Sequence, residues 1–132
     1  MSEHPPVTEE TKQEVRLWLD DVRKPWDHGR IGWHWAKSYE DAVYVCERYD
    51  VIEADLDHDL TIRQTTGYDD GEKTGYDFVC WMEARNFYPR DGVHVHSMNP
   101  SGADRMRAAL KSMKEKSDAP LANIPWRLIP AP

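Results

Sequence analysis

Two clusters of charged side chains directly follow two apolar runs of the chain. The run 15–19 is followed by Asp20, Asp21 and Arg23, and the run 51–56 by Asp57, His58 and Asp59. If both runs are strands of a parallel sheet, their carboxyl ends open on one edge, the usual ligand position in open α/β sheets. Carboxylates, a guanidinium and an imidazole at one edge predict an enzyme-like site.

A third group of polar side chains follows residues 93–97, where apolar and polar residues alternate as in a strand. It comprises His96, Ser97 and Asn99. An unperturbed imidazole titrates near pH ~6.5, so two at one site can hold one protonated and one neutral member. We therefore expect His58 and His96 to act as acid and base, in an order that the sequence leaves open, with Asp57 as a third catalytic residue.

Phosphate binding is the second role that these residue types suggest. Arg23 is the best anion clamp, because its guanidinium offers bidentate donors. Further expected substrate contacts are Ser97, Asn99 and Thr74. The carboxylates would repel a phosphate, and a divalent ion between them, Mg²⁺ or Mn²⁺, is the simplest resolution. The expected metal ligands are Asp20, Asp21, Asp57 and Asp59.

Several of these residues have a structural alternative. Thr74 and Asp77 match the spacing of a capping box, so helix initiation is a sufficient reason for both. Asn99 precedes a proline and suits the cap of a helix. The acid pairs could simply end the two strands. His94 lies one step further from the edge than His96 and is interpreted as a core or surface histidine.

The expected elements alternate between strand and helix. Strands are predicted at 15–20, 33–37, 51–57, 93–97 and 125–129, with helices that begin near residues 38, 74 and 99. The polar stretch 61–73 is a candidate lid. This pattern predicts an α/β fold, a flavodoxin-like, receiver-type doubly wound sheet of five mainly parallel strands. Residues 1–13 are interpreted as a polar N-terminal tail and 14–132 as one domain, since domains commonly run ~100 to 150 residues.

Composition limits the partners. The 24 acidic and 17 basic residues give a net charge of -7, which disfavours long-duplex DNA and leaves small phosphorylated ligands open. No run approaches the ~20 apolar residues of a membrane span, and the N-terminus has neither a basic start nor an apolar stretch, so we expect no membrane association and a cytoplasmic location. Cys46 and Cys80 are predicted to be buried structural thiols. The sequence does not identify a protein partner.

The motifs resemble those of two related groups. Response-regulator receiver domains are similar in the acid pair after strand one, the Asp after strand three and the Ser after strand four. The closer resemblance is to the cyclic-phosphate-processing receiver-like family, and it spans 15 to about 110. Its motifs look like Asp20-Asp21-x-Arg23-x-Pro25, Asp57-His58-Asp59-Leu60, Thr74-Gly75-x-Asp77 and His96-Ser97-x-Asn99-Pro100.

The resemblance implies a substrate with a cyclic phosphate, in RNA end repair or nucleotide signalling. The leading hypothesis is a phosphoesterase, a hydrolase for a 2′,3′-cyclic RNA end or a cyclic nucleotide, in which Trp26 or Trp33 could stack on a base. One alternative is a noncatalytic cyclic-nucleotide binder. Another is a receiver-like regulatory or protein-interaction module switched at Asp57. That module is the weaker reading because 125–130 lacks the lysine of receivers, which only Arg127 could replace.

Overall fold

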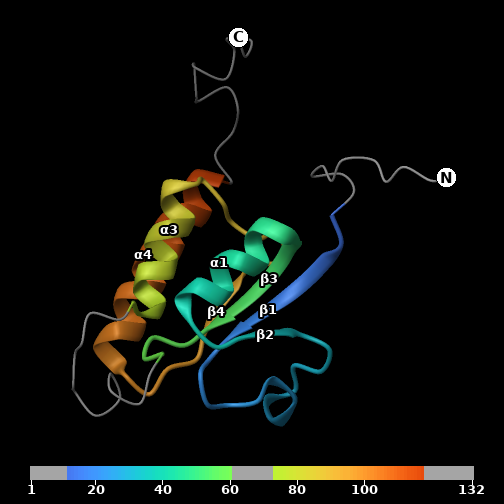
Figure 1. Cartoon of the computed structure of the whole chain (residues 1–132). Coiled ribbons are helices and arrows are strands. Elements are labelled where there is room, and N and C mark those ends of the chain that lie inside the picture. The colour runs from blue at the N-terminus through green and yellow to red at the C-terminus, as the bar shows by residue number, and fades with distance from the viewer. Residues whose placement is uncertain (1–11, 61–72, 118–132) are drawn as a thin grey trace, which may run out of the picture.

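The computed structural model describes residues 12–60 and 73–117. Within them four strands form one parallel sheet in the order β2-β1-β3-β4 (Figure 1). The strands are β1 (Glu14–Leu19), β2 (His34–Ala36), β3 (Asp50–Leu56) and β4 (Val93–Val95). This order matches the first four strands of the flavodoxin-like arrangement. The predicted fifth strand and Arg127 lie outside the described residues, as do residues 1–11 of the N-terminal tail and all but Lys73 of the candidate lid at 61–73.

Helices begin where the capping residues predicted. The longer ones are α1 (Tyr39–Arg48), α3 (Gly75–Ala84) and α4 (Pro100–Ser117). The Ser38 hydroxyl accepts a hydrogen bond from the Asp41 backbone N–H, and Thr74 and Asp77 form a reciprocal capping box. None of the helices in the described part combines the length and apolar character that crossing a membrane requires.

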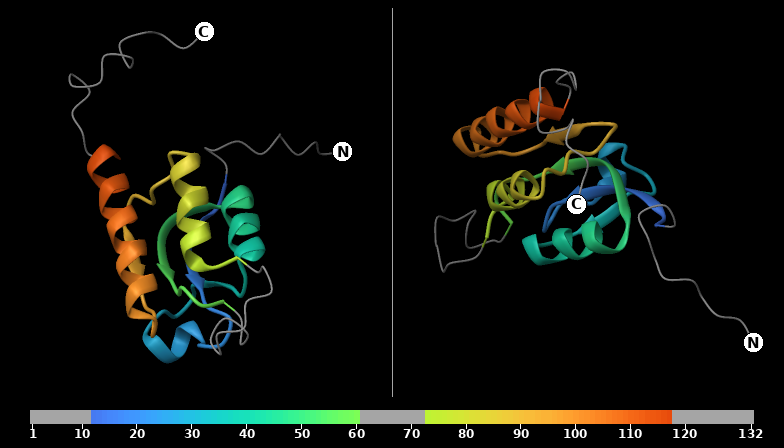
Figure 2. Two further views of the ribbon diagram at one scale, coloured as in Figure 1. Left: turned by 90° about the vertical axis from the view of Figure 1, so that its left-hand side faces the viewer. Right: turned by 90° about the horizontal axis from the view of Figure 1, so that it is seen from above.

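One face of the sheet packs against all three of these helices. Side chains alternate along a strand, so Leu17 and Leu19 of β1 and Ala54 and Leu56 of β3 face the same way. They join a core with α1, α3 and α4, and the helices stand side by side (Figure 2). The buried residues that α3 and α4 contribute to this core are Phe78, Val79, Met82, Met106, Leu110 and Met113.

The opposite face of the sheet carries aromatic and charged side chains. Trp18, Asp55 and His94 lie in register on β1, β3 and β4. A doubly wound sheet has helices on both of its faces. In the described ranges the helices α1, α3 and α4 all cover the same face of the sheet. The link from β1 to β2 holds only the short 3-10 helix η1 (Pro25–His28), because Gly29 with φ of 77° ends it after four residues.

The two cysteines differ in their surroundings. Cys46 of α1 packs partly buried against the core, and burial raises the pKa of its thiol to about 12. The prediction of a buried thiol is therefore confirmed for Cys46. It is wrong for Cys80, which is exposed because it lies on the outer side of α3.

Candidate functional site

Three carboxylates converge where β1 and β3 end. One oxygen each of Asp20, Asp21 and Asp57 lies within 4.8 Å of the others. Asp20 and Asp57 are almost fully buried. Burial, followed by repulsion from Asp20, raises the pKa of Asp57 to about 6. The crowded oxygens suit a hard divalent cation such as Mg²⁺. The predicted fourth ligand, Asp59, is not in this group of carboxylates.

Arg23 is folded back onto these carboxylates by a tight turn. One Asp20 oxygen, Oδ1, accepts hydrogen bonds from the backbone N–H groups of Val22 and Arg23, both at 2.8 Å. The Arg23 Nη1 then lies 3.2 Å from Asp20 Oδ2 and 3.8 Å from Asp57 Oδ2. The guanidinium is one third exposed. It therefore partly neutralises the acid cluster and still faces solvent, where it can meet an anion.

His58 is oriented by its neighbour Asp59. Its Nδ1 lies 2.7 Å from Asp59 Oδ1. A carboxylate at this distance accepts the Nδ1 proton, which leaves Nε2 of the neutral ring as a proton acceptor. Among the described residues the polar neighbours of this ring lie at Nδ1, and because its proton goes to Asp59, the amide nitrogen of Asn99 at 3.4 Å is a contact and not a hydrogen bond. The ring also packs on α4, where a Cβ added to Gly102 would lie 2.6 Å from two of its carbons. Only glycine admits the imidazole in this position.

His96 bridges two buried carboxylates. Its Nε2 lies 2.9 Å from Asp20 Oδ2 and its Nδ1 2.6 Å from Asp55 Oδ1. The ring is stacked on Trp18 with centroids 4.0 Å apart. Burial alone would lower the pKa of His96, but the hydrogen bonds and charges of the two carboxylates outweigh it and raise the pKa to about 9. The ring is thus an imidazolium that donates both protons.

The two histidines therefore belong to different hydrogen-bond sets. His96 faces Asp20, Asp55 and Trp18, whereas His58 faces Asp59 and α4. The geometry gives no support to the expected pairing of the two rings as acid and base. Sequence reasoning could not anticipate this, since both residues follow strand ends that meet at one edge. His94 lies away from the site, exposed and 2.8 Å from Glu53, as expected.

Asp55 and Arg30 were missed by the motif argument. Asp55 lies within β3, and its Oδ2 accepts hydrogen bonds from Arg30 Nε at 3.1 Å and Nη2 at 3.0 Å. Burial raises the pKa of Asp55, but His96 and Arg30 outweigh this and hold it below its usual range. An acid inside an otherwise apolar strand needs a buried partner, so the position of Asp55 in the sequence could have indicated a buried ion pair. Nothing in the sequence indicated that Arg30 supplies it.

Three of the predicted substrate contacts are engaged at helix starts. Asn99 Oδ1 accepts from the Gly102 backbone N–H at 3.0 Å, and its Nδ2 donates to Asp59 Oδ1 at 3.3 Å. The Ser97 hydroxyl accepts from the Asn99 backbone N–H at 3.1 Å. Thr74 is held in its capping box with Asp77. The structural alternatives for Thr74 and Asn99 are thus confirmed, and Asn99 also helps to place Asp59.

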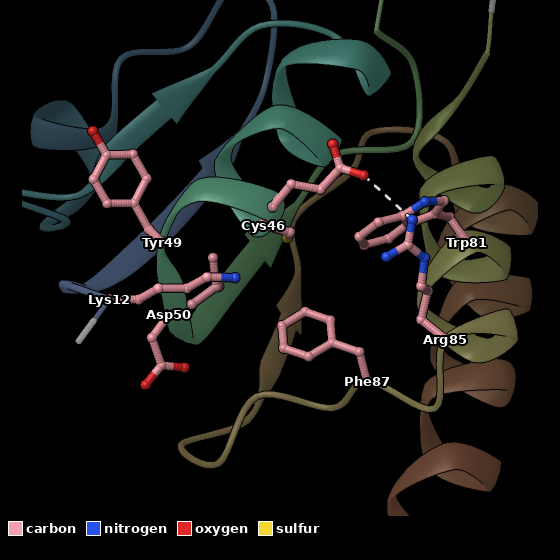
Figure 3. Close-up of a pocket in the computed structure, with 9 residues that line it drawn as sticks. Lys12, Cys46, Tyr49, Asp50, Trp81, Arg85 and Phe87 are labelled. Carbon is pink, nitrogen blue, oxygen red and sulfur yellow. Dashed lines mark hydrogen bonds and ion pairs between the residues drawn. The ribbon is translucent and has the colours of Figure 1, made fainter. Parts of the chain in front are cut away.

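A cavity of about 390 Å³ lies elsewhere, beside the start of β3 and the ends of α1 and α3 (Figure 3). Its lining includes Cys46, Trp81 and Phe87, and the ion pair of Arg85 and Glu47 closes one side at 3.3 Å. None of the predicted site residues lines it. Because parallel strands all begin at this end of the sheet, the cavity and the carboxylate cluster lie at opposite edges.

Comparison with known families agrees with the geometry. The family model described as the cyclic-phosphate processing receiver domain matches residues 15–112. The matched segment contains every residue of the carboxylate cluster and both histidines with their partners. Searches of curated proteins and of solved structures found no match. The model covers well over half of the chain, and the protein therefore belongs to the cyclic-phosphate processing receiver domain family.

Proposed function

We propose that the protein hydrolyses a cyclic phosphate at the carboxyl edge of the sheet. The observation that carries the proposal is the position of His58. Its ring is oriented by Asp59, and its backbone N–H donates to Asp57 Oδ1 at 2.9 Å, so it follows directly on the carboxylate cluster. A histidine of fixed tautomer beside oxygen ligands and an arginine is a suitable set for phosphodiester chemistry. The family supplies the cyclic phosphate as substrate class.

In this reaction the Nε2 of His58 accepts a proton from the attacking water. The water oxygen bonds to phosphorus, and the bond from phosphorus to one ring oxygen breaks. The imidazolium then returns its proton to that leaving oxygen, so His58 ends the cycle neutral. Arg23 stabilises the negative charge on the nonbridging oxygens, since its Nη1 already lies beside Asp20 and Asp57 and its side chain is partly exposed.

A divalent cation fits the cluster by its donors. Asp20, Asp21 and Asp57 offer only oxygen, and burial together with the charge of Asp20 raises the pKa of Asp57 by more than Arg23 lowers it. When bound, the cation would supply electrostatic stabilisation of the phosphate oxygens. Asp59 is left to orient His58. His96 then has a positioning role, because it holds Asp20 from the far side of the cluster.

The test is an assay of purified protein on RNA with a 2′,3′-cyclic end, cyclic mononucleotides and cyclic oligonucleotides, with Mg²⁺, Mn²⁺ or EDTA. We expect hydrolysis of one class, lost in His58→Ala by roughly the 10²- to 10⁴-fold that general acid–base catalysis contributes. His94→Ala is the matched control, since this exposed histidine lies off the site. If the wild-type protein binds one of these ligands without hydrolysing it, the phosphodiesterase hypothesis is wrong and the protein is a noncatalytic binder.

A further inference from the structure

Large apolar side chains are exposed on the two segments that follow β1 and β4 at the carboxyl edge of the sheet, the edge that carries the carboxylate cluster. Val22 is 67% exposed, Trp26 54%, Ile31 80% and Met98 82%. They form what we call the rim: three come from the loop between β1 and β2, and Met98 precedes α4. Among the described residues Tyr44 on α1 is the remaining large hydrophobic of this kind. Large apolar side chains left exposed on the loops of one sheet edge make that edge a candidate interaction site.

The loop that carries most of the rim is held firmly. Trp18 Nε1 donates to the Arg23 carbonyl at 2.8 Å, and Trp35 Nε1 donates to the Asp20 carbonyl at 2.6 Å. Arg30 is tied to the buried Asp55. η1 lies beyond the carboxyl ends of the strands in both views (Figures 1 and 2). The exposed apolar groups are thus presented by a fixed backbone, which lowers the entropic cost of binding.

Aromatic rings and cations alternate along this loop. Residues 22–37 contain the cations Arg23, Lys24, Arg30 and Lys37 and a single acid, Asp27, in a chain of net charge -7. Lys37 Nζ lies 4.3 Å from the centroid of the Trp35 ring, and the Arg30 guanidinium 4.7 Å from that of Trp33. These two rings already meet cations. Trp26 makes an edge contact with Trp35, at 5.6 Å between centroids, and is exposed.

We propose that the rim binds the single-stranded nucleotide chain that carries the cyclic phosphate, with an unpaired base stacked on Trp26. Bases stack on exposed aromatic side chains, and a basic groove follows the phosphates. A basic loop also provides the attraction that a phosphate needs to approach three carboxylates. This inference rests on the proposed function and narrows its substrate to an oligonucleotide, either RNA with a cyclic end or a cyclic oligonucleotide.

The experiment compares wild type, Trp26→Ala and Tyr44→Ala on a tetranucleotide with a 2′,3′-cyclic end, a cyclic oligonucleotide and the 2′,3′-cyclic mononucleotide. Tyr44 is the matched control because it is an equally exposed aromatic residue on α1. We expect Trp26→Ala to raise KM for one of the two oligonucleotides by roughly 5- to 100-fold with kcat retained, the range of one base stack. The oligonucleotide whose KM rises shows whether the substrate is RNA with a cyclic end or a cyclic oligonucleotide.

Binding of the same fluorescent oligonucleotides by anisotropy separates this inference from the proposed function. If no substrate turns over but Trp26→Ala still weakens binding and Tyr44→Ala does not, the proposed hydrolysis is wrong and the nucleotide-binding rim stands. If substrates turn over and Trp26→Ala changes neither KM nor oligonucleotide affinity, the rim is not a nucleotide site. Circular dichroism of each variant checks the fold.

Discussion

Replacing His96 by Gln removes the cation that lies between Asp20 and Asp55. Glutamine can donate to one carboxylate, whereas the imidazolium donates to both at 2.9 and 2.6 Å. A rise in the pKa of His96 from 6.5 to about 9 corresponds to roughly 3 kcal/mol, at about 1.4 kcal/mol per pKa unit. We therefore expect the free energy of unfolding at pH 6 to fall by about 3 kcal/mol, in line with the loss of one partner from a buried ion pair.

This contribution of His96 has a defined pH range. The folded protein holds the proton up to a pKa of about 9, whereas the unfolded chain loses it near 6.5. The stabilisation is fully present below pH 6.5 and is lost as the pH rises through 9. The gap in unfolding free energy between wild type and His96→Gln should accordingly narrow between these values.

Urea denaturation followed by tryptophan fluorescence at pH 6, 7.5 and 9.5, with EDTA present, measures this gap. His94→Gln is the control, because His94 is an exposed histidine paired with Glu53 and its loss should change stability little. Parallel pH profiles of wild type and His96→Gln would refute the bridge. A loss at pH 6 no larger than that of His94→Gln would refute it as well.

Three further predictions concern the other site residues. Gly102→Ala places a Cβ 2.6 Å from carbons of the His58 ring, so turnover should fall at least tenfold while thermal unfolding shifts by only a few degrees, which kinetics and calorimetry measure. Asn99→Ala removes the cap of α4 and should cost about 1 kcal/mol in urea unfolding, a loss that the uncharged capping residue of Asn99→Ser should largely avoid. Asp57→Asn should increase the free energy of unfolding at pH 7 by up to roughly 3 kcal/mol, because the folded protein raises the pKa of Asp57 from 3.8 to about 6. The destabilisation that the charged Asp57 causes is absent below pH 3.8 and complete above pH 6, so the gain should follow the same pH range. Mg²⁺ should reduce that gain if the cluster binds the cation, and an unchanged gain in a urea titration with Mg²⁺ would count against a cation at Asp57.

The sequence alone was enough to predict the four strands that the structure describes, the helix starts and the meeting of the acids at one edge. Capping residues act within one helical turn, so Ser38, Thr74 and Asn99 mark helix starts without knowledge of the fold. The alternation of strands and helices predicts a parallel sheet, and in such a sheet Asp20 and Asp57 must lie at the same edge. These are local or topological properties, which a linear pattern contains.

The tertiary structure decided what each side chain contacts. Asp55 contacts both Arg30 and His96, so residues from three different segments meet at one buried carboxylate. Gly102 meets His58 only because α4 packs over the end of β3. Such contacts depend on the direction of each side chain at the strand end and on the distance between elements. Spacing along the chain carries neither quantity, since both arise from packing.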